Sequence, residues 1–377
     1  MKIIIAGASD VGLHLAKLLS FESQDITLID SVKEQLTYAE THLDIRIIHG
    51  DPSALAVLKK ADVAGSDMVI AVSPVETTNL MCCLLSKQLG CKRTIARVTN
   101  IEFDKYKEDV DFHSLGIDEL ISPEELAVKE IQLLIDESAF NNSYEFEDGA
   151  LTMMGTTLEE SAPFVGKSVK EAAAVYSEVH FMPIAIKRAG TQTTLIPRGD
   201  TLFEAGDQVY FTSSKSGMDA LNELIGYTKQ EVENVMILGG GRIGKKTAED
   251  LCQRGMRVKL VESNKEKAIK LSGDLPNTLV IHGDGRNAEL LLEENIGGMD
   301  VFLAVTDDSE TNIMSCLMAK SNKVSKIIAL VENVDYFELT KSIGVDTLIN
   351  KKLLTANSIF RYVRKGKVVD LAKLNNM

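Results

Sequence analysis

Two glycine-rich segments hold the residues of this sequence that are best suited to binding a phosphate. Residues 239–244 read GGGRIG and match the full GxGxxG pattern, whereas residues 7–12 read GASDVG, with Ser9 at the middle position. Such glycines permit a tight turn, close approach of a pyrophosphate and close packing of helix on strand. The N–H groups and the dipole of the following helix attract the anion. The pattern predicts a phosphate site in at least one segment; the alternative is that the glycines serve packing alone.

An acidic residue follows each segment at a spacing typical of nucleotide-binding units. Asp30 lies 30 − 7 = 23 residues after Gly7, and Glu262 lies 262 − 239 = 23 residues after Gly239. A carboxylate at this point can accept hydrogen bonds from ribose hydroxyls and repels a 2′-phosphate. NAD(H) or an adenine nucleotide is therefore favoured over NADP(H).

Charged residues distinguish the two predicted sites. Arg242 occupies the place in the second segment that Asp10 occupies in the first. A guanidinium there can reach toward terminal phosphates, or it can remain a solvated surface group. Arg97 ends the run TIAR and is expected to point into the ligand crevice, whereas its counterpart is Leu330. The two sites should therefore differ in function.

The predicted nucleotide-binding residues lie at the carboxyl ends of expected strands or in the turns that follow. Asp51 and Asp284 would lie near an adenine or serve as helix N-caps, and Asn79 and Asn312 are expected to be structural. No catalytic residue and no metal ligand is predicted, because no His or Cys cluster has ligand spacing. The predicted cofactor-binding set is Gly7, Ala8, Ser9, Asp10, Val11, Gly12, Asp30, Asp51, Ser73, Arg97, Gly239, Gly241, Arg242, Ile243, Gly244, Glu262, Asp284 and Thr306.

The glycine segments belong to a longer repeat. Residues 3–12 return at 235–244 with an offset of 232 residues. After one inserted residue, HGD at 49–51 returns at 282–284 and Asn79 returns as Asn312, both with an offset of 233. A register kept over so many positions indicates two duplicated copies of one unit.

Each copy alternates short β-rich runs with amphipathic helical stretches. The first copy has strands KIIIA, ITLI, IRII, DMVIAV and TIARV, with helices expected around 11–20, 32–40, 53–60 and 76–89. Nearly continuous apolar strands indicate a parallel sheet covered on both faces. The predicted fold class is α/β, with two duplicated Rossmann-like doubly wound parallel sheets. Between the copies, turns and short strands over 144–227 predict a small α+β domain suited to binding or assembly.

Composition disfavours several classes of function. Acidic residues outnumber basic ones by 55 to 41, and the net charge of −14 disfavours nucleic acid and anionic lipid as partners. No apolar run approaches the roughly 18–20 residues needed to cross a bilayer. The five cysteines lie in apolar segments and are expected to be reduced core residues. We therefore expect a soluble cytoplasmic protein.

The repeated motifs resemble those of the TrkA family, the NAD-binding components of Trk potassium uptake, which are built from KTN/RCK domains. They are GASDVG, LID, IIHGD, AVSPVETTNLMCC and IARV in the first copy, and LGGGRIG, LVE, VIHGD and AVTDDSETNIMSC in the second. The middle segment resembles the RCK-C (TrkA-C) domain through PFVGKSV and IPRGDTLFEAGDQVYF. The resemblance implies RCK-N domains at 1–135 and 232–366, an RCK-C domain at 144–228, and the start of a missing second RCK-C domain at 367–377.

The resemblance implies regulation rather than catalysis. It implies a peripheral cytoplasmic subunit on the inner membrane that assembles as a ring, expected to be a homotetramer, beneath a potassium-channel subunit of the TrkH or TrkG type. NAD(H), ATP or ADP would bind the Rossmann units, change the shape of the ring and so bias the gate. Two departures from the family pattern weaken the predicted phosphate binding. Ser9 replaces the middle glycine of the first loop, and Leu330 stands in the second copy where the arginine equivalent to Arg97 is expected.

Other functions remain open at this point. An NAD-dependent oxidoreductase would need a proton-transfer group near the nicotinamide, and His14, His49 and His282 have no evident acid partner. A ligand-free Rossmann scaffold is favoured by Ser9 and Leu330. A sensor that gates another cation transporter is a third possibility.

Overall fold

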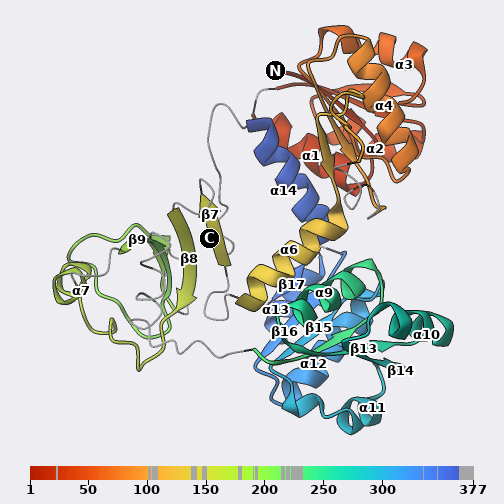
Figure 1. Cartoon of the computed structure of the whole chain (residues 1–377). Helices are drawn as coiled ribbons and strands as arrows, with labels where there is room; N and C mark the ends of the chain where they lie inside the picture. Colours follow the sequence, from red (N-terminus) through yellow and green to blue (C-terminus); the bar gives the residue numbers. More distant parts are fainter. Residues whose placement is uncertain are drawn as a thin grey trace.

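The computed structural model contains two six-stranded sheets in which all neighbouring strands pair in parallel, and a separate antiparallel sheet (Figure 1). The polar stretch DESAFNN (136–142) is predicted to be a linker between the first unit and the small domain, and its residues 137–141 lie outside the residues that the structure describes. So do the segment 367–377 and most of the stretch SGMDALNELIG (216–226), for which the sequence predicts a helix. The described residues are 1–22, 24–100, 103, 109–136, 142–146, 151–176, 181–189, 191, 194–213, 217, 221, 232–333, 335–345 and 347–364.

The first sheet has the strand order β3-β2-β1-β4-β5-β6, which is the order of dinucleotide-binding folds. Ile3 and Ile5 of β1 pack with Leu15 of α1, whereas Ile4 packs with Cys82 of α4 on the other face. Burial on both faces explains the continuous apolar run of β1. The elements are β1 (Lys2–Ala6), α1 (Asp10–Ser20), β2 (Asp25–Asp30), α2 (Lys33–His42), β3 (Arg46–His49), α3 (Leu55–Lys60), β4 (Met68–Ala71), α4 (Glu76–Gln88), β5 (Arg93–Arg97), β6 (Glu119–Ile121) and α6 (Pro123–Asp136), with a 3₁₀ turn at Val63–Gly65.

The second sheet repeats this order as β14-β13-β12-β15-β16-β17. The predicted fold class, with two Rossmann-like parallel sheets and a small domain between them in the sequence, is confirmed. The elements are β12 (Asn234–Leu238), α9 (Arg242–Gln253), β13 (Arg257–Glu262), α10 (Lys265–Asp274), β14 (Thr278–His282), α11 (Ala288–Glu293), β15 (Val301–Ala304), α12 (Ser309–Ser321), β16 (Lys326–Leu330), α13 (Tyr336–Ser342), β17 (Leu348–Ile349) and α14 (Lys351–Arg364), with a 3₁₀ turn at Ile296–Gly298.

The middle segment forms an antiparallel sheet of order β10-β9-β11-β8-β7. Its core is aromatic: Phe164, Phe203 and Phe211 are fully buried against one another. A capping box between Ser168 and Glu171 starts its helix. The elements are β7 (Asn142–Phe146), β8 (Leu151–Thr157), α7 (Val169–Val175), β9 (Phe181–Lys187), β10 (Thr194–Leu195) and β11 (Gln208–Ser213).

Helix α6 leaves the first unit and packs on the second (Figure 1). It begins at Pro123, whose missing N–H costs nothing at a helix start. Val128, Ile131 and Ile135 recur every three to four residues and are buried in the core of the second unit, beside Ile243 of α9. A hydrogen bond of 2.7 Å from Gln132 to Asp250 adds a polar contact.

Helix α14 makes the reciprocal crossing. It follows the last strand of the second sheet, yet Ala356, Ile359 and Val363 are buried in the core of the first unit, with Leu15 of α1. Each fully buried isoleucine contributes about 1.5–3 kcal/mol relative to an exposed one. The two units are therefore stabilised by each other's helices, which fixes how their glycine loops face one another.

Candidate functional site

The first and third glycines of each loop are required by the protein itself. Gly7 has φ +114°, and a Cβ there would lie 2.6 Å from the backbone N of Ser73. A Cβ on Gly12 would lie 1.9 Å from the carbonyl oxygen of Gly7. Gly239 and Gly244 repeat these constraints in the second loop. Packing therefore explains these four glycines without a ligand.

The middle glycine of the second loop has no such explanation. A Cβ on Gly241 would meet no protein atom within 4 Å. Gly241 is also the N-cap of α9 and makes no side-chain cap, whereas α10, α11 and α12 of the same unit are capped by side chains. This open position at the start of an uncapped helix fits a phosphate group, which would take the place of both the side chain and the cap.

Ser9 fills the corresponding place in the first loop. Its hydroxyl donates a 3.0 Å hydrogen bond to the carbonyl oxygen of Val72, just after β4. The hydroxyl is thus held against the protein. Ser9 is the N-cap of α1 but makes no side-chain cap hydrogen bond, so it leaves the start of that helix without a side-chain cap.

The two predicted ribose acids hold the loops in shape. Asp30 accepts hydrogen bonds from the N–H groups of Ala8 (2.6 Å) and Val32 (2.8 Å). Glu262 accepts one from Gly240 N–H at 3.1 Å and lies 3.0 Å from Lys267 Nζ. Burial would raise the pKa of Glu262, but these donors and the N–H of Asn264 bring it below the usual value. Each carboxylate oxygen has a second lone pair, so a ribose hydroxyl can still bind.

Asn79 and Asn312 have the structural role that the sequence predicted. Asn312 accepts a hydrogen bond from Thr306 N–H (3.0 Å) and donates to the carbonyl oxygens of Thr306 and Leu330. Asn79 makes the equivalent bonds to Ser73 and Arg97. Each asparagine ties the carboxyl ends of the two strands that border its crevice.

Replacing Asn312 by Ala should therefore lower the free energy of unfolding by about 1–3 kcal/mol, because buried backbone groups lose their partners. Urea unfolding followed by circular dichroism measures this change. The exposed Met314 lies on the same helix, and Met314→Ala serves as the control. An effect of Asn312→Ala no larger than that of the control would contradict the structural role.

Asp51 and Asp284 are not helix N-caps, so that alternative is wrong. Asp51 accepts a hydrogen bond from Ser53 N–H at 2.8 Å, whereas α3 starts only at Leu55. Asp284 forms the same kind of turn with Arg286, and Asn287 is the cap of α11. Both aspartates form Asx turns, in which the short acidic side chain accepts a hydrogen bond from the backbone N–H two residues later.

Each glycine loop contacts the other unit, so both predicted sites lie at the contact between the units. Arg242 of the second loop donates a 2.8 Å hydrogen bond to the carbonyl oxygen of Thr99, just after β5 of the first unit. Arg97 is half-buried at the end of β5, with Glu124 and Glu332 as charged neighbours. Its Nε has no hydrogen-bond partner among the described residues. The predicted site of the first unit therefore has two guanidinium groups at its border, one from each unit, with Glu124 near both.

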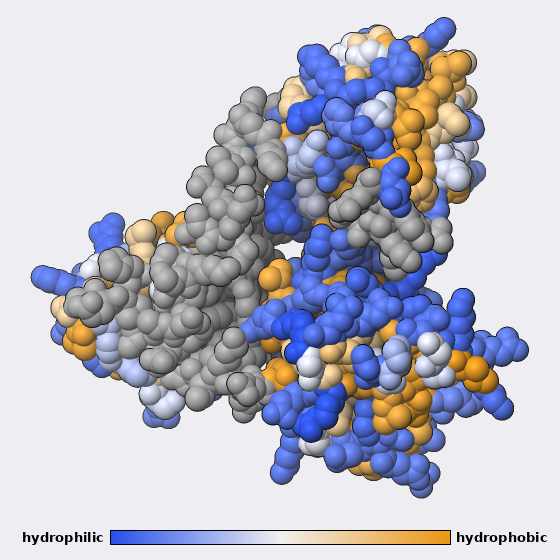
Figure 2. Space-filling model, viewed as in Figure 1, coloured by the Kyte–Doolittle hydropathy of each residue, from blue (hydrophilic) through white to orange (hydrophobic). Residues whose placement is uncertain are grey.

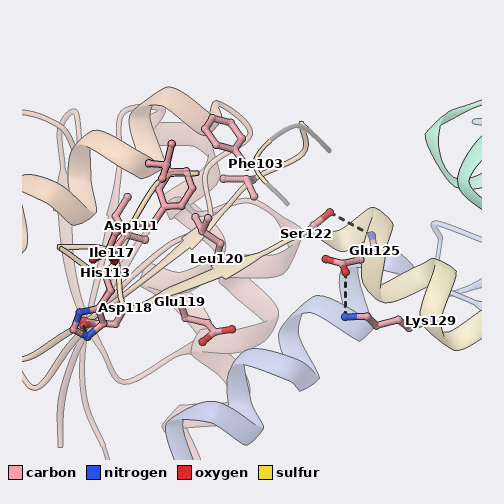
Figure 3. A pocket seen from close by; sticks show the side chains of 13 residues that line it. Phe103, Asp111, His113, Ile117, Asp118, Glu119, Leu120, Ser122, Glu125 and Lys129 are labelled. Carbon is pink, nitrogen blue, oxygen red and sulfur yellow. Dashed lines mark hydrogen bonds and ion pairs between the residues drawn. The ribbon is translucent and has the colours of Figure 1, made fainter. Parts of the chain in front are cut away.

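A separate hollow of about 420 Å³ lies beside β6 and the start of α6 (Figure 3). Phe103, Phe112 and Leu120 form its apolar wall, and Glu125 and Lys129 form an ion pair of 3.1 Å at its rim. None of the predicted nucleotide-binding residues lines this hollow. This hollow is therefore separate from the predicted nucleotide-binding site.

Among the described residues, no three His, Cys, Asp or Glu side chains gather in a way that could hold a metal ion. No helix in the described part of the chain is long and apolar enough to span a membrane. Burial raises the pKa of Cys82 to about 12, so this thiol stays protonated near neutral pH.

Comparison with protein families matches both copies and the middle segment. The model of the TrkA-N domain matches residues 3–123 and 235–351, and that of the TrkA-C domain matches residues 153–226. The chain belongs to the TrkA family. A TrkA relative from Halomonas elongata, named "Trk system potassium uptake protein TrkA", is 34% identical over 375 residues, which cover 99% of this chain and 81% of the relative.

Solved structures share the TrkA fold at low sequence identity. A GsuK channel bound to NAD has a TM-score of 0.68 at 19% identity. The match covers 97% of this chain and 64% of the GsuK chain. GsuK bound to ADP has a TM-score of 0.59 at 14% identity, and the match covers 96% of this chain and 69% of the GsuK chain. These likenesses establish the arrangement of the fold.

Residues that connect the crevices of this TrkA chain were absent from the sequence prediction. They are Thr99 and Glu124 near Arg242, Lys352 near Asp10, and Glu332 near Lys352. The repeat register marks Glu124 and Lys352 as equivalents, since each is the second residue of its helix. Glu124 and Lys352 contact the glycine loop of the opposite unit only because their helices cross between the units, and no local sequence pattern reveals that crossing.

Proposed function

We propose that this chain is a nucleotide-binding regulatory subunit of a potassium uptake system, which acts by binding rather than by catalysis. NAD(H), ATP or ADP would bind at the carboxyl ends of the strands in each Rossmann unit, on the residues predicted above. The open place at Gly241, at the start of an uncapped helix, is the observation that carries this proposal. The names of the TrkA relatives and the NAD- and ADP-bound GsuK structures support it.

Regulation requires that the ligand prefer one arrangement of the units. Each glycine loop contacts the opposite unit, through Arg242 to Thr99 and Asp10 to Lys352. A ligand that orders one loop therefore changes the contact between the units. A tenfold preference for one arrangement corresponds to about 1.4 kcal/mol per site, and several linked sites in an assembly multiply it.

We further propose assembly into a homotetrameric ring that acts on a TrkH- or TrkG-type membrane subunit from the cytoplasm. Hydrophobic side chains gather over α3 and α4 on the surface of the first unit (Figure 2). Met81 of α4 and Met314 of α12 are exposed at equivalent places in the two copies. The domain division at 1–135, 144–228 and 232–366 is part of this proposal.

Potassium flux into vesicles that hold the membrane subunit tests the function. Adding the chain with NADH, ATP or ADP should change the flux, and the chain with both crevices blocked (Ser9→Asp/Gly241→Asp) should leave it insensitive to nucleotide. Flux that responds equally to the blocked chain would contradict nucleotide control. Consumption of NADH with any substrate would instead favour an oxidoreductase.

A further inference from the structure

The contacts that join each glycine loop to the opposite unit use equivalent positions but have opposite polarity. Arg242 of the second loop lies 4.0 Å from Glu124, at the start of α6. Asp10 of the first loop pairs with Lys352, at the start of α14. The acid and the base have exchanged places between two equivalent positions. Each pair still contains one acid and one base, but the residue that the loop supplies is a cation in one pair and an anion in the other.

The loop residue is the more exposed member of each pair. The side chain of Arg242 is 56% exposed and that of Glu124 is 14% exposed. The side chain of Asp10 is 69% exposed and that of Lys352 is 37% exposed. A ligand in the neighbouring crevice therefore meets the loop residue more readily than its partner in the helix.

Arg242 borders the first crevice. Its guanidinium bonds the carbonyl oxygen of Thr99, and the N–H of Thr99 donates to Glu76 at 3.0 Å. Glu76 is the first residue of α4, and the loop between Ser73 and α4 follows β4. Burial lowers the pKa of the nearby Arg97, which nevertheless stays a cation at neutral pH. Arg97 and Arg242 therefore lie beside this crevice together with the carboxylates of Glu76 and Glu124.

Asp10 borders the second crevice in the same way. Its partner Lys352 lies 3.9 Å from Glu332, whose N–H donates to Ser309 Oγ at 3.0 Å. Ser309 is the first residue of α12, after the Thr306 turn. In place of the second arginine this crevice has Leu330. Its border therefore has two carboxylates, from Asp10 and Glu332, beside the ammonium groups of Lys351 and Lys352.

We propose that Asp10 and Arg242 are specificity-determining residues, each for the crevice of the opposite unit. Arg242 favours a nucleoside di- or triphosphate at the first crevice, because a guanidinium pairs well with terminal phosphate oxygens. Asp10 disfavours a nucleoside di- or triphosphate at the second crevice, because its carboxylate repels the terminal phosphates. A dinucleotide, which has fewer phosphate charges, is therefore the ligand expected there. This inference rests on the proposed function, since it concerns the same crevices.

An exchange of charges tests the role of Asp10. Calorimetry measures the affinities for ATP and NAD of the full wild-type chain, of Asp10→Asn, and of Asp10→Arg/Lys352→Glu, which reproduces the polarity of the first crevice. Each is measured alone and with Gly241→Asp, which blocks the second crevice. The ratio of ATP to NAD affinity at the second crevice should rise about tenfold in the exchanged pair, and less in Asp10→Asn. The rise should disappear with Gly241→Asp.

The outcomes separate this inference from the proposed function. NAD binding with an unchanged affinity ratio in both the neutral and the exchanged variant would overturn the role of Asp10 and leave the proposed function intact. A rise that persists in the Gly241→Asp background would also overturn it, because the effect would then lie at the first crevice. Absence of nucleotide binding to the wild-type chain would overturn both. Circular dichroism of each variant checks that the fold is retained.

Discussion

Replacing Gly241 by Asp is expected to lower nucleotide affinity at the second crevice at least about 100-fold while leaving the fold intact. A Cβ at this position meets no protein atom within 4 Å, so the new side chain has room. Its carboxylate would stand where a pyrophosphate approaches the helix start, and the repulsion between close like charges exceeds about 3 kcal/mol at a partly shielded site. Calorimetric titration with NAD gives the affinity.

Gly241→Ser is the matched control. It introduces the residue that the first loop has at this position, which adds bulk and a hydroxyl but no charge. We expect a much smaller loss, because a serine can turn its hydroxyl toward the backbone as Ser9 does. Equal affinity of Gly241→Asp and the wild type at the second crevice would mean that this loop does not bind phosphate.

Replacing Ile359 by Ala is expected to destabilise the first Rossmann unit, although this residue lies in the last helix of the second. Ile359 is fully buried in the core that contains Leu15 and Ile3. Removing a buried isoleucine side chain costs about 2–5 kcal/mol, from lost burial and the cavity left behind. Amide hydrogen exchange of β1 and β2 should become faster, which reports the stability of this unit.

The control for Ile359→Ala is Ile269→Ala, at an exposed position of α10. This substitution should change stability by less than about 0.5 kcal/mol. If Ile359→Ala accelerated exchange only in strands of the second sheet, the reciprocal crossing of α6 and α14 would be wrong.

Much of the fold could be predicted because its signals are local. The apolar run of β1 is buried on both faces, and such runs are typical of parallel sheets. The glycine loops need their positive φ and close contacts at Gly7 and Gly239, so the pattern marks the first turn of each unit. The role of Asn79 and Asn312 also followed from their place early in the helix after β4 or β15.

The crossing of the helices could not be predicted, because an amphipathic pattern shows which face is buried but not against what. Val128 and Ile131 in α6 have the spacing of any core-facing helix, yet they lie in the second unit. The charge pairs of Asp10 and Arg242 depend on that crossing. The sequence does not distinguish the two roles of Asp51, since a turn residue and an N-cap both precede a helix by a few positions.

A calorimetric titration of the full chain with NAD, NADH, ATP and ADP tests most directly whether the glycine loops bind nucleotides. We expect saturable binding of at least one of these nucleotides, without turnover, and loss of that binding in the variant Ser9→Asp/Gly241→Asp. Binding that survives in this variant would contradict the placement of the sites at the glycine loops. No saturable binding of any of the four would contradict the claim that the chain senses nucleotides.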